Sequence, residues 1–255
     1  MLNIVVPMAG RGQRFVDAGY ADPKPLIPVH GQPMIQLVIQ NLTPSRPHRF
    51  HFLIQREQAE RYQLDRRLAE WAPGSTVTLL DGVTEGAACT VLLARDRIDN
   101  DNPLMIANCD QYIEAAIDDY LAALDGADGL IMTMWADDPK WSFVRRDGSG
   151  RVSGVVEKEV VSNEATVGIY NFRRGRDFVA AADAMIAAGL RVNGEYYVAP
   201  AYDRMIAAGA EIVCYDIGHP GRGMHGLGTP RDLQDFLASP VSRAVAQPLE
   251  VRRQA

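Results

Sequence analysis

Two glycines and two arginines follow the first apolar run of the chain, in the stretch VVPMAGRGQRF at Val5–Phe15. A lysine, Lys24, lies a few residues further on, within PKPLIPV. Glycine lets backbone N–H groups approach a phosphate without an intervening side chain, and Arg and Lys neutralise the phosphate charge. The pattern predicts either a phosphate-binding loop or a tight turn at a strand end, and the spacing alone favours neither.

Common phosphate motifs do not occur in this stretch. A P-loop requires GxxxxGK[ST], which the chain lacks, and a dinucleotide fingerprint requires a third glycine after Gly10 and Gly12. A glycosyltransferase, which also uses a nucleotide-binding α/β domain, would carry a DxD metal motif where the chain has ANCDQY, at Ala107–Tyr112. The glycosyltransferase is therefore the weaker alternative.

Asp110 follows directly on a short apolar run at 103–107. A carboxylate at the end of a buried strand can coordinate Mg²⁺, which prefers oxygen ligands and bridges substrate phosphates. It can equally cap a following helix. Taken alone, Asp110 leaves both interpretations open.

These residues must be positioned by the elements around them. Leu2–Val6 is an apolar, β-branched run typical of a strand buried on both faces. The alternation that follows predicts a parallel sheet covered by helices, and DGSG at 147–150 predicts a β-hairpin turn. Further strands are predicted at 49–54, 76–80, 103–107, 129–135, 142–145, 152–157, 166–172 and 211–215. Helices are predicted at 34–42, 57–71, 87–97, 117–124, 178–188, 199–208 and 229–237.

Composition restricts the class of protein. The 255 residues are 47% hydrophobic and 23% charged, with a net charge of −6, which is ordinary for a globular protein and unsuited to a nucleic-acid partner. Three scattered cysteines predict a reducing compartment, and no segment resembles a signal peptide or membrane span. We expect a cytoplasmic protein with no membrane partner; the sequence leaves a homo-oligomer open.

Taken together, AGRGQRF at Ala9–Phe15 and PKPLIPV at 23–29 resemble the sugar-phosphate nucleotidylyltransferases, which couple an NTP to a phosphomonoester. The resemblance extends over about 2–237 and is strongest in the first thirty residues. It implies that Arg14 and Lys24 are catalytic and stabilise the α-phosphate and the departing pyrophosphate. It also implies Mg²⁺ as cofactor, with Asp110 as its ligand. The residues that it implies for nucleotide binding are Met8, Ala9, Gly10, Arg11, Gly12, Gly86, Ala87, Asn108 and Asp110.

The resemblance also implies an acceptor site in the second half of the chain. Pro139–Lys158 follows the family layout, so Glu157 would accept hydrogen bonds from acceptor hydroxyls and Lys158 would bind the acceptor phosphate. Thr166, Val167, Gly168 and Glu195 would complete this site.

Three departures from the family pattern bear on the acceptor and the metal. Trp141 and Ser142 stand where the family usually has Tyr-Gly, and Gly226 stands where it commonly has a second metal-binding Asp. These departures leave the acceptor and the second metal ligand open.

The fold class predicted is therefore α/β: a Rossmann-like, mixed and mostly parallel sheet flanked by helices, with a β-rich acceptor-side insertion. We expect one domain at 1–238, with an NTP-binding half at about 1–136 and an acceptor-binding half at about 137–238. A C-terminal tail at 239–255 is expected to be loosely ordered.

The predicted reaction yields an NDP-activated metabolite and pyrophosphate, most simply from a sugar 1-phosphate, in nucleotide-sugar and polysaccharide biosynthesis. Two alternatives stay open: a cytidylyltransferase acting on phosphocholine or a phosphorylated amino acid, and a non-catalytic nucleotide-binding relative.

Overall fold

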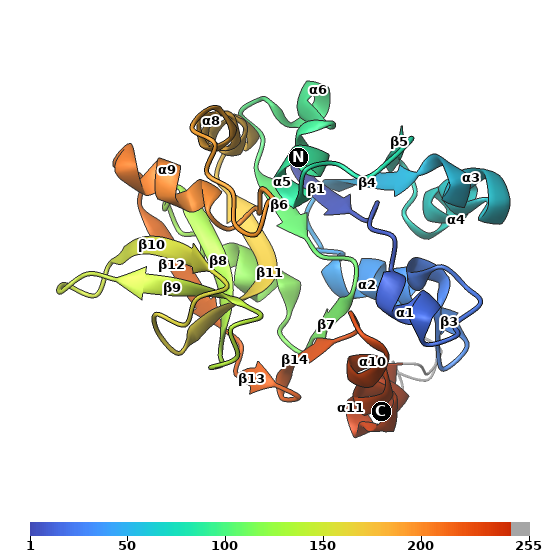
Figure 1. Ribbon diagram of the computed structural model, residues 1–255. Coiled ribbons are helices and arrows are strands. Elements are labelled where there is room, and N and C mark those ends of the chain that lie inside the picture. The colour runs from blue at the N-terminus through green and yellow to red at the C-terminus, as the bar shows by residue number, and fades with distance from the viewer. Residues whose placement is uncertain (246–255) are drawn as a thin grey trace.

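The computed structural model describes residues 1–245, which form a mixed sheet with helices on both faces (Figure 1). The strands are β1 (Leu2–Pro7), β2 (Pro28–Val29), β3 (Gln32–Pro33), β4 (His48–Gln55), β5 (Thr76–Leu80), β6 (Leu104–Ala107), β7 (Gln111–Ile113), β8 (Gly129–Trp135), β9 (Ser142–Arg146), β10 (Val152–Glu157), β11 (Glu164–Phe172), β12 (Ile212–Asp216), β13 (His219–Pro220) and β14 (Gly223–Gly226). The helices are α1 (Gln13–Asp17), the 3₁₀ helix η1 (Lys24–Leu26), α2 (Met34–Leu42), α3 (Arg56–Tyr62), α4 (Leu64–Trp71), α5 (Ala87–Leu92), α6 (Arg95–Ile98), α7 (Ile117–Ala122), α8 (Gly175–Ala187), α9 (Ala201–Ala207), α10 (Pro230–Ala238) and α11 (Pro240–Val245).

The main sheet has nine strands and two distinct parts. In the first half of the chain β5, β4, β1 and β6 are neighbours and all pair in parallel. β11 then adds antiparallel to β6 and also pairs with β8 and β9, which carry β12 and β10. Figure 1 shows the blue and cyan strands on one side of β6 and the yellow and orange elements on the other. The predicted mixed, mostly parallel α/β fold is confirmed.

Alternate residues of the strands enter two apolar cores, one on each face of the sheet. Val5 and Leu53 pack among side chains of α5, α8 and α9, whereas Ile4 and Phe52 pack among those of α2, α4 and α10. Because both faces are covered, the strands read as continuous apolar runs. Each Val or Leu buried in this way contributes about 1.5–3 kcal/mol.

The parallel arrangement fixes where the functional loops lie. The segments that follow β1, β4, β5 and β6 all leave the sheet at the same edge, since parallel strands share one direction. The loop at 8–12, the turn at 81–86 and the segment at 108–110 therefore all lie at this edge.

Some predicted elements differ in detail. The predicted helix 57–71 is two helices, because Gln63 has a φ of 51° and ends α3, and the predicted helix 87–97 is broken between α5 and α6. The predicted hairpin is present as β9 and β10. The expectation of a loose tail is wrong for 240–245, which form α11, and lies outside the described residues beyond that point. No helix within residues 1–245 is long and apolar enough to cross a membrane.

Candidate active site

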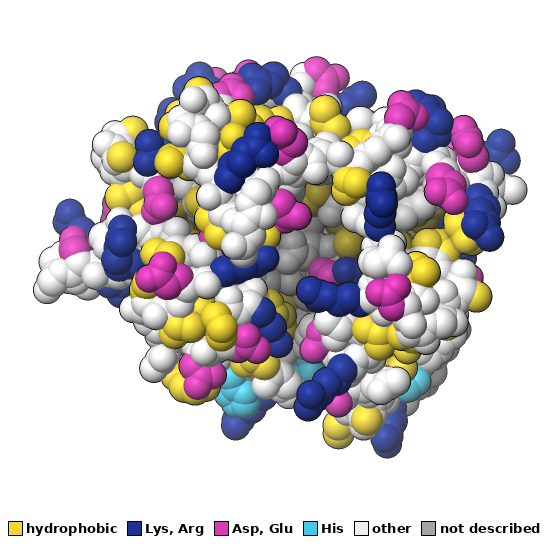
Figure 2. All heavy atoms as spheres, in the orientation of Figure 1, with side chains coloured by type: hydrophobic (Ala, Val, Ile, Leu, Met, Phe, Trp, Pro, Cys, Tyr) yellow, Lys and Arg dark blue, Asp and Glu magenta, His cyan; other side chains and the backbone are white. Residues whose placement is uncertain are grey.

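A hollow lies where the two parts of the sheet meet. Figure 2 shows this face hollowed at its centre, with Lys and Arg side chains on both sides. The loops at the carboxyl edge of β1, β5 and β6 border one side, and residues of β9, β10 and β11 border the other. Most of the residues predicted for the acceptor and two of those predicted for the nucleotide, Ala87 and Asn108, thus border one cleft.

The loop after β1 is held close to Lys24. Gly12 has a φ of 62°, and a Cβ added there would lie 3.0 Å from the Lys24 Cβ, so a larger residue would crowd this contact. The loop is anchored below by the Met8 N–H, which donates to the Leu53 carbonyl at 2.9 Å. Arg14 lies on α1 with an exposed side chain. A backbone loop with free positive charge at its rim suits an anionic ligand.

Lys24 and Asp110 form an ion pair between Nζ and Oδ2. The two side chains are 19% and 25% exposed, so the pair is only partly screened by water. Burial lowers the pKa of Lys24, but the Asp110 carboxylate more than offsets this, and the net result is a raised pKa. Lys24 is therefore an ammonium at neutral pH, beside the partly exposed carboxylate of Asp110.

The surroundings of Asp110 fit a magnesium ion. A Cβ added at Gly228 would lie 2.7 Å from Asp110 Oδ2, so the glycine leaves space beside this oxygen. No group of three or more His, Cys, Asp or Glu that could hold a metal is found among residues 1–245. A single carboxylate matches Mg²⁺, which keeps water ligands and takes others from substrate phosphates.

Gly226 lies on β14, next to β7, where it pairs with Gln111. A Cβ added at Gly226 would face Asp232, at 3.4 Å from its Cγ, whereas the position facing Asp110 is Gly228. Asp232 accepts a hydrogen bond from Thr229, whose hydroxyl caps α10. The predicted departure at Gly226 thus leaves Asp110 without a second carboxylate from this strand.

The turn at 81–88 is fastened to the opposite side of the cleft. The Tyr196 N–H donates to the Glu85 carbonyl at 2.8 Å, and the Ala88 N–H donates to the Tyr196 carbonyl at 3.0 Å. These bonds place the predicted nucleotide residues Gly86 and Ala87 beside the segment that contains Glu195. The segment before α9 and the turn that leads into α5 are therefore joined through backbone hydrogen bonds.

A cavity of about 310 Å³ lies on the side predicted for the acceptor. Its walls bring together most of the residues predicted for the acceptor and two predicted for the nucleotide. The lining includes Ala87, Asn108, Lys140, Trp141, Ser142, Glu157, Lys158, Thr166, Val167, Gly168, Tyr170 and Tyr197.

Glu157 is the carboxylate of this cavity. Ser142 donates its hydroxyl to Glu157 Oε2, and Tyr170 shares a hydrogen bond of 2.9 Å with Thr166 nearby. Burial raises the pKa of Glu157, although the Ser142 hydroxyl acts in the opposite direction. One oxygen of the Glu157 carboxylate thus already accepts a hydrogen bond from the protein itself.

Lys158 is the cation nearest this carboxylate along the chain, and Tyr197 holds it. Lys158 Nζ donates to the Tyr197 hydroxyl at 2.6 Å and lies 4.7 Å from the centre of the Tyr197 ring. This hydrogen bond is the main cause of the raised pKa of Lys158. Glu195 is exposed and does not line the cavity, whereas Tyr197, two residues later, does. The sequence indicated Glu195 and missed Tyr197, since paired tyrosines after a turn also suit a core.

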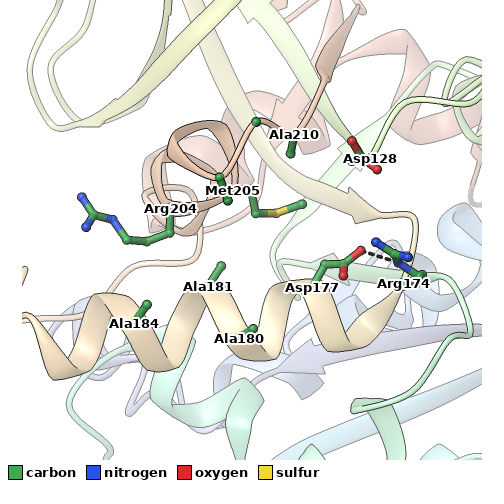
Figure 3. Close-up of a pocket in the computed structure, with 11 residues that line it drawn as sticks. Asp128, Arg174, Asp177, Ala180, Ala181, Ala184, Arg204, Met205 and Ala210 are labelled. Atoms are coloured by element: carbon green, nitrogen blue, oxygen red, sulfur yellow. Dashed lines mark hydrogen bonds and ion pairs between the residues drawn. The ribbon is translucent and has the colours of Figure 1, made fainter.

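A second hollow, of about 430 Å³, lies between α8 and α9 (Figure 3). Its walls are largely alanine, and the charged residues at one end, Arg174 and Asp177, bond to each other at 2.8 Å. Figure 3 shows the guanidinium of Arg204 directed away from the hollow. It contains none of the predicted site residues.

Comparison with known proteins gives three findings. The model of the nucleotidyl transferase family matches residues 4–186. The chain is 28% identical over 228 residues to the bifunctional protein GlmU of Alkalilimnicola ehrlichii, and 29% identical over 228 residues to that of Burkholderia multivorans. These alignments cover 86% and 83% of this chain, and the chain spans about half of those proteins, 46% in each case. A crystal structure of a nucleoside-diphosphate-sugar pyrophosphorylase from Vibrio cholerae superimposes with a TM-score of 0.79 at 25% identity, covering 92% of this chain and 100% of that one.

Proposed function

This chain belongs to the nucleotidyl transferase family of enzymes, and we propose that it transfers a nucleotidyl group from an NTP to a sugar 1-phosphate. One observation carries the proposal. The Lys24–Asp110 pair lies at the carboxyl edge of the parallel strands, and Asn108, two residues before Asp110, lines the cavity that contains Glu157 and Lys158. In the proposed function, the triphosphate would bind at the ion pair and the acceptor phosphate would bind in this neighbouring cavity.

In the proposed reaction, an oxygen of the acceptor phosphate attacks the α-phosphorus of the NTP. The bond between the α-phosphorus and the bridging oxygen breaks, and pyrophosphate leaves with its electron pair. Since the acceptor supplies the nucleophile, the protein has to position two anions and stabilise developing charge. Lys24 and Arg14 would stabilise charge on the transferred and departing groups, and Lys158 would hold the attacking phosphate.

Asp110 would hold Mg²⁺, which supplies charge neutralisation at the phosphate oxygens. In the free protein the Lys24 ammonium lies against this carboxylate. An incoming triphosphate would offer Lys24 new acceptors, and Asp110 would then be free to bind the metal. On substrate binding, Lys24 and Asp110 would therefore separate: Lys24 would bind the triphosphate and Asp110 would bind the metal.

The charge of the cavity favours a sugar 1-phosphate over phosphocholine. Lys140 Nζ lies 5.1 Å from the centre of the Trp141 ring, and Lys158 Nζ lies over Tyr197. A quaternary ammonium binds to the faces of such aromatic rings, but here a lysine ammonium already lies over the Trp141 ring and another over the Tyr197 ring. An acceptor with an anionic phosphate and uncharged hydroxyls matches these two lysines and Glu157 better.

The test is pyrophosphate release in a matrix of NTPs and acceptors with Mg²⁺ present. The NTPs would be ATP, CTP, GTP, UTP and dTTP. The acceptors would be several sugar 1-phosphates, phosphocholine and phosphoserine. We expect release with a sugar 1-phosphate, abolished in Lys24→Ala and Asp110→Ala. Release with phosphocholine alone would overturn the acceptor class, and NTP binding without release from any pair would indicate a non-catalytic relative.

A further inference from the structure

Gln55 is the last residue of β4, and its place in the sheet sets it between two loops. β4 lies between β1 and β5, with Leu53 paired with Pro7 and Gln55 paired with Leu80. The chains that leave β1 and β5 therefore pass on either side of Gln55.

The Gln55 side-chain amide donates to both of these chains. Its Nε2 lies 2.5 Å from the Ala9 carbonyl oxygen and 3.1 Å from the Gly82 carbonyl oxygen. A primary amide nitrogen carries two hydrogens, so both donors are used, each on a different loop. Ala9 belongs to the loop after β1, and Gly82 begins the turn that leads to Gly86.

Packing does not provide this connection. A hollow of about 570 Å³ lies beside the amide, bordered by Arg11 of the first loop, by Gly82 and Val83 of the second, and by Gln58. Arg11 and Val83 are exposed. At its far end the turn is fixed by backbone hydrogen bonds to Tyr196, but at Gly82 the link to the first loop is made by the side chain of Gln55. Asp81, the residue before Gly82, also accepts a hydrogen bond of 2.5 Å from Arg56 Nε of α3, but this bond does not reach the first loop. Substitution of Gln55 therefore removes the side-chain link between the two loops and leaves the Arg56–Asp81 bond in place.

We propose that Gln55 is a positioning residue that sets the spacing between the loop at 8–12 and the turn at 81–86. This inference rests on the proposed function, in which these two segments bind the NTP. Gln55 touches neither substrate in this scheme. Without it, the two segments would have to be ordered by the nucleotide itself, and the cost of ordering would weaken NTP binding.

The test compares Gln55→Met with a matched control, Gln58→Met. Methionine has a similar length and no hydrogen-bond donor. Gln58 lies on α3, borders the same hollow, and its buried Oε1 has no hydrogen-bond partner among the described residues. Calorimetric titration with each of the five NTPs and Mg²⁺, without acceptor, gives Kd for the nucleotide. Glucose 1-phosphate serves as the acceptor probe, and thermal melting gives Tm.

We expect Gln55→Met to raise the Kd of the bound NTP about 10- to 100-fold, the change equivalent to two ordinary hydrogen bonds. Its Kd for glucose 1-phosphate and its Tm should stay close to those of Gln58→Met. An unchanged NTP Kd, or a Tm loss that accounts for the weaker binding, would overturn the role of Gln55. If the wild-type protein itself binds no NTP, the proposed function fails instead.

Gln55→Glu sharpens this test. An ionised glutamate would face two carbonyl oxygens with no hydrogen to donate, whereas a protonated one donates a single hydrogen. The ratio of NTP Kd between Gln55→Glu and Gln55→Met, measured at each pH, cancels the titration of the nucleotide. This ratio should fall as the pH is lowered, and a ratio that does not change with pH would contradict a donor role.

Discussion

The two sides of the cleft are built differently. On the nucleotide side, short loops leave neighbouring parallel strands, and the charged residues Lys24 and Asp110 meet because β1 and β6 are adjacent in the sheet. On the acceptor side, the polar groups come from antiparallel strands and from the segment before α9, and each is paired within the protein. On the first side, the partly exposed charges of Lys24 and Asp110 pair with each other. On the second side, the Glu157 carboxylate and the Lys158 ammonium are each held by a hydrogen bond to a neutral side chain.

In the proposed function, this difference separates the tasks of the two sides. A triphosphate needs strong, adaptable charge, which Lys24 and the exposed Arg14 would provide. A sugar 1-phosphate would be distinguished by its hydroxyls, which requires polar groups in fixed positions. Substitutions on the two sides should therefore affect different measured quantities, and this expectation can be tested.

The largest effect is expected at the Lys24–Asp110 pair. Lys24→Met and Asp110→Asn should each lower kcat by about a hundredfold to a thousandfold, because each removes a group aimed at phosphate charge. Their effects on metal binding should be opposite. In the nucleotide-free protein Lys24→Met removes the ammonium that competes for Asp110, so Mn²⁺ should bind more tightly, whereas Asp110→Asn should weaken Mn²⁺ binding.

Electron paramagnetic resonance of free Mn²⁺ measures this binding without turnover. Glucose 1-phosphate affinity should be the same in both variants as in the wild type, since the cavity residues are untouched. Equal weakening of Mn²⁺ binding in both variants would contradict competition between Lys24 and the metal for Asp110.

A smaller and more selective effect is expected at Lys158. Lys158→Met should raise the KM of the acceptor about tenfold and leave the Kd of the NTP unchanged, because in the proposed function the Lys158 ammonium, which lines the cavity with Glu157, binds the acceptor phosphate. Tyr197→Phe keeps the ring and loses the hydroxyl to which Lys158 donates, so it should raise the same KM by a smaller factor. Steady-state kinetics with either substrate varied separates the two constants.

Arg151→Met serves as the control for charge, since Arg151 lies exposed at the tip of the β9–β10 hairpin. A rise in NTP Kd in Lys158→Met would mean that the two sides do not act separately.

The two sides of the cleft also differ in how much of each could be predicted from the sequence. The meeting of the 8–12 loop with Asp110 was predictable, since apolar runs at 2–6 and 103–107 alternate with helices and parallel strands end at one edge. In the parallel half the predicted strands and helices are present apart from the helix breaks, whereas the short elements α1, η1, β2, β3 and β7 were not predicted. Gln63, which ends α3 with a positive φ, belongs to a residue type that gives no warning of a break.

The contacts missed from the sequence are those between distant segments. Tyr197 reaches Lys158 across 39 positions of the chain, and Gln55 reaches Ala9 across 46. Gly228 faces Asp110 only because β14 pairs with β7. No local pattern marks such residues, because their roles are set by strand pairing and not by their neighbours in sequence.

The smallest expected effect concerns Ser142 and appears in the pH dependence of the acceptor side. Burial raises the pKa of Glu157, and the hydroxyl of Ser142 counteracts this by donating to the carboxylate. Ser142→Ala should therefore raise the Glu157 pKa further, by about one unit or less, as expected for one lost hydrogen bond. Acceptor hydroxyls need the ionised carboxylate, so acceptor affinity is present above this pKa and is lost as the pH falls through it. The acid limb of kcat/KM for the acceptor should move to higher pH.

Ser153→Ala, on the neighbouring β10, is the control, since the Ser153 hydroxyl donates to the Arg145 carbonyl and not to Glu157. The pH profile of NTP binding should be the same in all three proteins, because Lys24 has a raised pKa and keeps its charge over this range. A shift of the NTP profile together with the acceptor profile would show that Ser142 acts on the whole fold and that the two sides are not independent.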